Sequence, residues 1–185
     1  LFIDRDGVII KDMHYIKNIE EVSLEKGVVK LLERTTLLGW RNVIVTNQSG
    51  IFRGKLTWND YLNVTSRMIS LLGGKCYIDA IIANSEGPNA SKFWRKPSPE
   101  MLFFASKKLN IDLTKSIMVG DRLTDLQAGA NAKVSQLVHV LTGHGYKERD
   151  KIKSMLNNNY FLNFQADNNI HLIKDLNEFP YKIIN

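Results

Sequence analysis

The chain has 185 residues, of which 44% are hydrophobic, and its formal net charge is +6. This length predicts one globular domain, residues 1–185, whose core is large enough to fold without a disulfide or a structural metal. The single cysteine, Cys76, excludes an intramolecular disulfide and indicates a reducing compartment. No apolar run approaches the roughly 20 residues that cross a bilayer, and no signal peptide is visible, so we expect a cytoplasmic protein without a membrane segment.

The basic residues are spread along the chain rather than gathered in one segment. A nucleic-acid-binding face is typically a concentrated basic patch. The distribution therefore favours a solvated basic surface that attracts small anions over a nucleic-acid interface.

Short apolar runs alternate with amphipathic stretches, and this alternation predicts a doubly wound parallel α/β sheet. In chain order, the predicted strands are Leu1–Asp4, Asn42–Thr46, Ile78–Ala83, Ser116–Gly120, Gln136–Val140 and Ile170–Ile173. The predicted helices are Lys26–Leu38, Trp58–Leu72, Pro99–Leu109, Leu123–Ala132, Lys147–Leu156 and a last short one at Asp175–Tyr181. We expect the Asn-rich stretch Asn157–Asn169 to be an irregular loop. Sheets of this type bind ligands at the carboxyl ends of their strands.

Three polar clusters follow predicted strands. Asp4-Arg5-Asp6-Gly7 places two carboxylates near each other, and such a pair favours a hard divalent cation such as Mg²⁺. Thr46-Asn47-Gln48-Ser49-Gly50 offers a hydroxyl and backbone N–H groups, which suit an anion. Gly120-Asp121-Arg122-Leu123-Thr124-Asp125 supplies a second carboxylate pair, and Arg95-Lys96-Pro97 adds two cations. Each cluster alone is typical of a turn or helix cap, but the four together point to phosphate chemistry.

The four clusters resemble the motifs of the haloacid dehalogenase superfamily: Asp4-x-Asp6, Thr46, Lys96 and Gly120-Asp121-x-x-x-Asp125. The flanking residues are similar to the branch that contains histidinol phosphatases and heptose-bisphosphate phosphatases. Those residues are Phe2–Gly7, Val45–Gly54, Arg95–Met101 and Val119–Gly129. The resemblance is clear from Leu1 to about Gly145.

The resemblance implies a magnesium-dependent phosphatase that forms an aspartyl-phosphate. Asp4 would be the nucleophile, and Asp6 would act first as general acid and then as general base. Mg²⁺ would be held by Asp4, Asp6 through its backbone carbonyl, and Asp121. Asp125 would support the Asp121 loop.

The resemblance also implies a binding site for the substrate. Thr46, the backbone N–H of Asn47 and Lys96 would bind the phosphoryl oxygens, in a loop completed by Gln48 and Ser49. Other contacts with the substrate would come from Arg95, Arg122, Asp12 and Tyr15. The expected substrate is a small phosphorylated sugar, and the expected reaction removes the 7-phosphate of D-glycero-D-manno-heptose 1,7-bisphosphate in lipopolysaccharide or capsule precursor synthesis. We expect a monomer.

The zinc-binding loop common in this branch, built from three Cys and one His, has lost its ligands. The corresponding positions hold Asn84, Glu86, Lys92 and Trp94. A structural zinc site needs four nitrogen or sulfur ligands, so we predict no zinc. The chain's histidines also lack the spacing of a metal site, although His144 follows a predicted strand and could line the site: His14, His139, His144 and His171.

Two other activities share this chemistry: histidinol phosphate hydrolysis and removal of a 3′-phosphate from DNA. Arg5, the run Thr124–Gly129 and Leu141-Thr142-Gly143 favour the small-metabolite branch over the nucleic-acid one. A catalytically silent binding protein with the same fold is the third alternative, and the intact motifs disfavour it.

A large cap domain is not expected. The two segments in which this superfamily inserts one, Gly7 to about Val22 and Leu72 to Arg95, are short. Neither can form a separate core, since a domain needs roughly 50 residues or more. We therefore expect an open site, screened by a flap at Asp12–Tyr15 and by the loop Asn84–Trp94.

Overall fold

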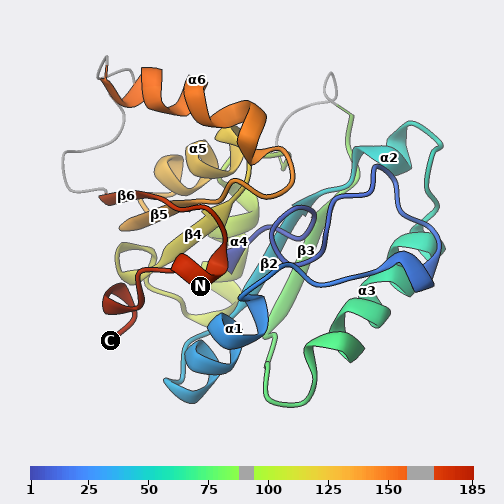
Figure 1. Ribbon diagram of the computed structural model, residues 1–185, viewed down its shortest axis with the longest axis horizontal. Helices are drawn as coiled ribbons and strands as arrows, with labels where there is room; N and C mark the ends of the chain where they lie inside the picture. Colours follow the sequence, from blue (N-terminus) through green and yellow to red (C-terminus); the bar gives the residue numbers. More distant parts are fainter. Residues whose placement is uncertain (88–93, 158–168) are drawn as a thin grey trace.

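A six-stranded, wholly parallel sheet forms the centre of the computed structural model, which describes residues 1–87, 94–157 and 169–185 (Figure 1). The strand order is β3-β2-β1-β4-β5-β6, so the direction of winding reverses between β1 and β4. The strands are β1 (Phe2–Ile3), β2 (Val43–Asn47), β3 (Ala80–Asn84), β4 (Ile117–Gly120), β5 (Gln136–His139) and β6 (Asn169–Leu172). The predicted doubly wound fold and all six predicted strands are confirmed.

Helices cover both faces of the sheet (Figure 1). They are α1 (Val28–Leu37), α2 (Ser49–Phe52), α3 (Trp58–Leu72), α4 (Glu100–Leu109), α5 (Leu123–Asn131) and α6 (Gly145–Asn157). Short 3-10 turns occur at η1 (Ile19–Glu21), η2 (Leu113–Lys115), η3 (Leu176–Glu178) and η4 (Tyr181–Ile183). None of the helices in the described ranges is both long and apolar enough to cross a membrane.

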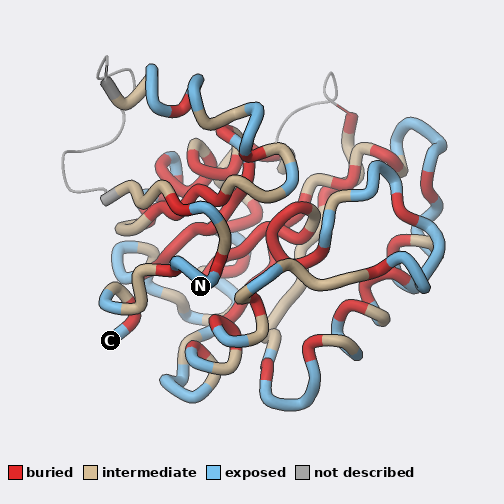
Figure 2. Tube along the Cα trace, in the orientation of Figure 1, coloured by how far each residue is buried: buried red, intermediate tan, exposed pale blue. Residues whose placement is uncertain are grey.

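Successive strand residues enter two different hydrophobic cores, because side chains alternate across a strand. Ile3 and Val119 pack with the buried faces of α1 and α3, whereas Phe2 and Met118 pack with α4, α5 and α6. Figure 2 shows this burial concentrated along the strands and the inner sides of the helices. A strand that is buried on both faces reads as a continuous apolar run, which is why the sequence pattern identified these strands.

The prediction of a helix at Asp175–Tyr181 is wrong, since η3 and η4 replace it. Phe179, which precedes Pro180, adopts an extended backbone with ψ 130°, as steric contact with a following proline favours. The chain also forms the short helix α2, which the sequence pattern did not predict. Residues 158–168 of the predicted Asn-rich loop lie outside the described residues.

No large cap covers the carboxyl edge of the sheet in the described part of the chain. Between β1 and α1, the chain forms a flap that contains only η1 and isolated bridges at Ile10. Between β3 and α4, the described residues form no helix or strand. In the described ranges, the carboxyl edge of the sheet is therefore covered by loops and short helical turns.

Replacing Leu102 with alanine should lower the free energy of unfolding by about 2–5 kcal/mol, because it would leave a cavity in the core beneath α4. Leu102 is fully buried in α4, which packs on β2 and β3. Lys107→Ala is the matched control on the same helix. Because the Lys107 side chain is exposed, this substitution should change the free energy of unfolding by less than about 0.5 kcal/mol. Urea unfolding measures both, and similar losses would contradict the packing of α4.

Candidate active site

One pocket lies at the carboxyl ends of β1, β2 and β4, where the winding of the sheet reverses. Most of the predicted site residues line it: Asp4, Asp6, Asp12, Tyr15, Asn47, Gln48, Ser49, Arg95, Lys96 and Arg122. Thr46 and Asp121 are buried and lie outside its lining. The lining also includes Arg5, Arg53, Thr124, Asp125 and His144.

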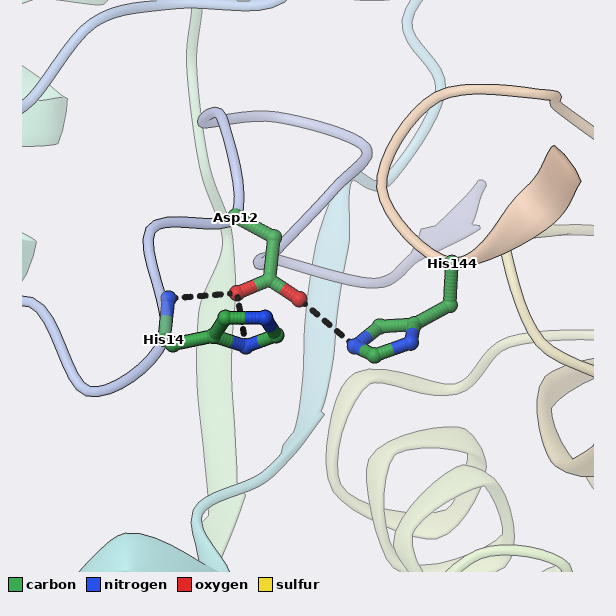
Figure 3. Close-up of side chains that lie close together, drawn as sticks. All are labelled: Asp12, His14 and His144. Carbon is green, nitrogen blue, oxygen red and sulfur yellow. Dashed lines mark hydrogen bonds and ion pairs between the residues drawn. The ribbon is translucent and has the colours of Figure 1, made fainter. Parts of the chain in front are cut away.

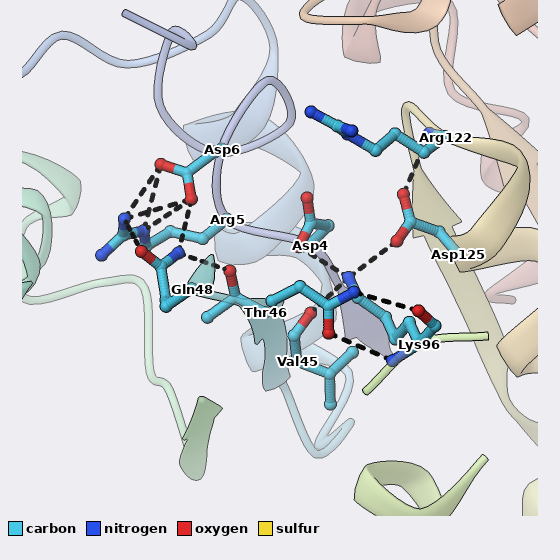
Figure 4. Close-up of polar contacts among 10 residues, drawn as sticks. Asp4, Arg5, Asp6, Val45, Thr46, Gln48, Lys96, Arg122 and Asp125 are labelled. Atoms are coloured by element: carbon cyan, nitrogen blue, oxygen red, sulfur yellow. Dashed lines mark hydrogen bonds and ion pairs between the residues drawn. The ribbon is translucent and has the colours of Figure 1, made fainter. Parts of the chain in front are cut away.

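The Lys96 ammonium lies between two buried carboxylates at the floor of the pocket (Figure 4). Its Nζ is 2.7 Å from Asp4 Oδ1 and 2.7 Å from Asp125 Oδ1, and it donates a third hydrogen bond to the Val45 carbonyl at 2.8 Å. Burial alone would lower the pKa of Lys96, but Asp125 and Asp4 outweigh it and raise that pKa above its ordinary value. Lys96 is therefore a permanent cation at neutral pH.

Two glycines allow these loops to approach one another. A Cβ on Gly120 would lie 2.2 Å from Asp125 Cβ, so only glycine lets Asp125 return to the end of β4. Gly7 has φ +82°, and a Cβ there would lie 2.7 Å from Asp121 Oδ2. Both residues stand within the clusters that the sequence analysis identified.

Asp121 has an unsatisfied oxygen. Its Oδ2 accepts a hydrogen bond from the His144 backbone N–H at 2.6 Å, whereas the buried Oδ1 has no partner among the described residues. Burial, followed by the charges of Asp125 and Asp4, raises the pKa of Asp121 to about 9. Burial likewise raises the pKa of Asp4 to about 6, although Lys96 opposes the shift.

Asp4, Asp121 and Asp125 fit a hard divalent cation. Each offers a carboxylate oxygen, and the three oxygens lie within 4.8 Å of one another. Mg²⁺ prefers such oxygen ligands, and its charge would offset the cost of burying these carboxylates together. Asp125 Oδ1 also contacts Lys96, and its Oδ2 accepts a hydrogen bond from the Arg122 backbone N–H, so these contacts tie α5 to the lysine loop.

The Asp6 carboxylate points away from this cluster and toward Arg5 (Figure 4). Arg5 Nη2 donates to both Asp6 oxygens at 3.0 and 3.1 Å, and Gln48 Nε2 donates to Oδ2 at 2.7 Å. Arg5 is itself 2% exposed, lies 4.8 Å from the Tyr61 ring centroid and donates to Thr65. Arg5 was not predicted as a site residue, although its position between Asp4 and Asp6 in the sequence could have indicated it.

The loop after β2 is held by its own side chains. Asn47 Nδ2 donates to the Lys96 carbonyl and Asn47 Oδ1 accepts from the Lys96 N–H, both at 3.1 Å. Gln48 Nε2 also donates to the Thr46 hydroxyl at 2.9 Å. Asn47 thereby couples the end of β2 to the lysine loop, while Ser49 begins α2 in the pocket wall.

Three guanidinium groups lie at the mouth of the pocket. Arg95 donates to the Glu86 carbonyl at 3.2 Å, and Arg53 donates to the Tyr15 hydroxyl at 2.9 Å. The pKa of Arg95 is lowered by burial and then by the charges of Arg122 and Arg53. Because guanidinium groups stay protonated, their mutual repulsion favours an anion among them. Arg53 was also missed, although it lies within the matching string Val45–Gly54.

Three of the four residues at the zinc-ligand positions lie in the described ranges, and they contact other protein groups. Asn84 and Glu86 bond one another, with the Glu86 N–H donating to Asn84 Oδ1 at 3.0 Å. Trp94 packs edge-on against Phe104, with ring centroids 5.3 Å apart. Lys92 lies outside the described residues.

Known proteins share this sequence and architecture. Residues 93–163 match a family model described as HAD-hydrolase-like. The D-glycero-beta-D-manno-heptose-1,7-bisphosphate 7-phosphatase of Helicobacter pylori is 34% identical over 84% of this chain and 94% of that protein. The D-glycero-alpha-D-manno-heptose-1,7-bisphosphate 7-phosphatase of Photorhabdus laumondii is 34% identical over 86% of this chain and 91% of that protein.

Solved structures agree with these relatives. The crystal structure of D,D-heptose 1,7-bisphosphate phosphatase from B. bronchiseptica, complexed with magnesium and phosphate, has a TM-score of 0.80 at 29% identity and covers 95% of this chain and 92% of that one. The identity to the two phosphatases extends over more than nine tenths of their lengths. The chain therefore belongs to the HAD-like hydrolases, in the branch that contains these heptose-bisphosphate phosphatases, and it is a phosphoric monoester hydrolase.

Proposed function

We propose that this phosphatase removes the 7-phosphate of D-glycero-D-manno-heptose 1,7-bisphosphate in lipopolysaccharide or capsule precursor synthesis. The observation that carries the proposal is the charge pattern of the pocket. Its floor combines carboxylates with Lys96, and its mouth gathers the guanidinium groups of Arg53, Arg95 and Arg122. This pattern suits a substrate with one phosphate at the floor and a second at the mouth, and the relatives named above act on such bisphosphates.

The proposed reaction begins with Asp4. One of its carboxylate oxygens forms a bond to phosphorus while the bond from phosphorus to the sugar oxygen breaks, which leaves an aspartyl-phosphate and the free sugar hydroxyl. Asp6 gives the leaving oxygen its proton and then takes one from the water that hydrolyses the intermediate. Because Arg5 and Gln48 hold Asp6 in the free protein, its side chain has to turn toward the phosphoryl group in this role.

Fixed donors stabilise the transferred group. Lys96, the Thr46 hydroxyl and the Asn47 backbone N–H bind the phosphoryl oxygens on which negative charge develops. Asp4, Asp121 and the Asp6 backbone carbonyl would hold Mg²⁺, which would supply positive charge to screen the carboxylates from the phosphate. We also propose that the loop before Arg95 binds no zinc, because Asn84, Glu86, Lys92 and Trp94 stand at the positions of the branch's zinc ligands.

The mouth of the pocket would select the substrate. Arg95 and Arg122 contact the second phosphate, while Asp12 and Tyr15 contact the sugar. Histidinol phosphate carries an ammonium group in place of a second phosphate, so the cationic mouth disfavours it. We further propose that the protein acts as a cytoplasmic monomer, in keeping with its single cysteine.

A specificity profile tests the assignment. We expect kcat/KM with Mg²⁺ to be highest for a heptose 1,7-bisphosphate, and the profile should include both anomers, histidinol phosphate and a 3′-phosphorylated oligonucleotide. A preference for either of the last two substrates would overturn the proposed substrate.

Asp4→Asn should lower kcat by several orders of magnitude, because an amide cannot attack phosphorus and a lost nucleophile costs that much in comparable hydrolases. Steady-state turnover of a bisphosphate measures the effect. Asp150→Asn, on the exposed side of α6, is the control and should retain the wild-type rate. If Asp4→Asn kept more than a few per cent of that rate, the covalent mechanism would be wrong.

Chelation with EDTA should abolish turnover, and added Mg²⁺ should restore it. In Asp121→Asn, the Mg²⁺ concentration for half-maximal rate should rise about tenfold or more, because the substitution removes a charged ligand. Even residues that only support a ligand change metal affinity by about 10–100-fold when they are replaced. Asp150→Asn again serves as the control. An unchanged Mg²⁺ requirement in Asp121→Asn would remove Asp121 from the metal site.

Arg95→Ala should reduce kcat/KM about ten- to a hundredfold for the bisphosphate, which corresponds to about 1.5–3 kcal/mol for a charged hydrogen bond. For a generic monoester, which lacks the second phosphate, the reduction in kcat/KM should be much smaller. Arg41→Ala is the control, since Arg41 pairs with Asp79 at the opposite edge of the sheet. Equal losses on both substrates would instead place Arg95 on the transferred phosphoryl group.

A further inference from the structure

Two histidines and an aspartate meet at the mouth of the pocket (Figure 3). Asp12 and His14 belong to the flap after β1, and His144 belongs to the loop between β5 and α6. His144 Nε2 lies 2.9 Å from Asp12 Oδ2, and His14 Nδ1 lies 3.9 Å from Asp12 Oδ1. The two imidazole rings have centroids 5.8 Å apart. The fold therefore joins residues that are far apart in the sequence and carry no metal-binding spacing.

We propose that Asp12, His14 and His144 form a second metal site, distinct from the acidic site at the pocket floor. In a tetrahedral site with bonds of about 2.0–2.1 Å, neighbouring ligand atoms lie about 3.3 Å apart. In this structure the two imidazoles contact different oxygens of Asp12, Oδ2 for His144 and Oδ1 for His14, and one ligand atom from each of the three residues lies within 4.8 Å of the others. Side-chain rotations that draw these atoms together would bring the three side chains onto one ion, and His14 has the freedom to move because its side chain is 76% exposed.

The ligand types determine which ion the site takes. Two imidazoles and one carboxylate suit zinc and its neighbours in the first transition series, whereas the oxygen-only floor suits Mg²⁺. The two sites thus discriminate between metals by ligand chemistry. Three protein ligands leave a fourth position open at the mouth of the pocket, and an ion here would fasten the flap to the loop before α6.

The protonation of His144 is compatible with metal binding. Burial, followed by the charge of Arg122, lowers the pKa of His144, which is the direction that favours the neutral imidazole a metal binds. His14 and Lys147 act on it in the same direction, while Asp12 opposes them. Arg122 and Lys147 would also repel an incoming cation, so we expect an exchangeable ion rather than a structural one.

The remaining histidines do not offer a comparable site. His139 Nε2 contacts the Asp121 carbonyl and its Nδ1 accepts from Arg149, so both ring nitrogens are engaged. His171 Nε2 contacts Gln136 on the neighbouring strand. The chain has four histidines in all, and His14 and His144 are the two whose rings lie together, with centroids 5.8 Å apart.

Equilibrium dialysis of the full chain against Zn²⁺ tests the proposal, with Mg²⁺ in large excess to occupy the acidic floor. We expect one equivalent of saturable zinc. His14→Ala and His144→Ala should each weaken zinc binding at least about tenfold. Replacing residues that only support a ligand already lowers metal affinity by about 10–100-fold. The matched control is His171→Ala, which should bind zinc as the wild type does. Co²⁺ should show a visible absorption spectrum typical of nitrogen ligation, and His14→Ala should abolish it.

His14→Ala is the decisive variant because its exposed side chain is not needed for folding, which circular dichroism verifies. The proposal is overturned if zinc fails to saturate in the presence of Mg²⁺. It is equally overturned if both histidine variants bind zinc as tightly as the wild type does. Neither outcome depends on turnover, so the proposed substrate stands or falls separately.

Discussion

The buried ammonium of Lys96 is the interaction on which the site depends. Asp4 follows β1 and Asp125 lies in the first turn of α5. The two carboxylates would repel one another at the floor of the pocket, but each lies 2.7 Å from the same Lys96 Nζ. Removing one partner of such a buried pair leaves an uncompensated charge and typically costs about 3–5 kcal/mol. The lysine loop is in turn fixed to the end of β2 by Asn47, so one cation links the ends of β1 and β2 to the first turn of α5.

The negative charge at the floor of the pocket is nevertheless only partly neutralised. One ammonium cannot satisfy three carboxylates, and the raised pKa of Asp121 and its unpartnered Oδ1 express that deficit. The mouth has the opposite imbalance, because guanidinium groups lie close to one another. A phosphate ester that arrives with a divalent cation would relieve both imbalances at once, which is the physical basis for selective binding in an open pocket.

The side chains that we propose for proton transfer and ligand contact are restrained to different degrees. Arg5 is buried and binds Asp6 through two hydrogen bonds from Nη2, so the free protein keeps that carboxylate away from Asp4. The flap is freer, since the side chains of Tyr15 and His14 are exposed. The chemistry thus lies on rigid strand ends, while the entrance can adjust.

The sequence by itself determined the fold class, the six strands and the residues that meet at their carboxyl ends. Strands buried on both faces have to be continuous apolar runs, and ligand-binding residues follow them directly, so both signals are local. The tertiary structure alone decided which partners these residues have. Asp6 faces Arg5 rather than Asp121, and His144 meets the flap across the pocket, because such contacts depend on how loops from distant strands pack. The last predicted helix failed for a different reason, since a single proline overrode a weak helical pattern.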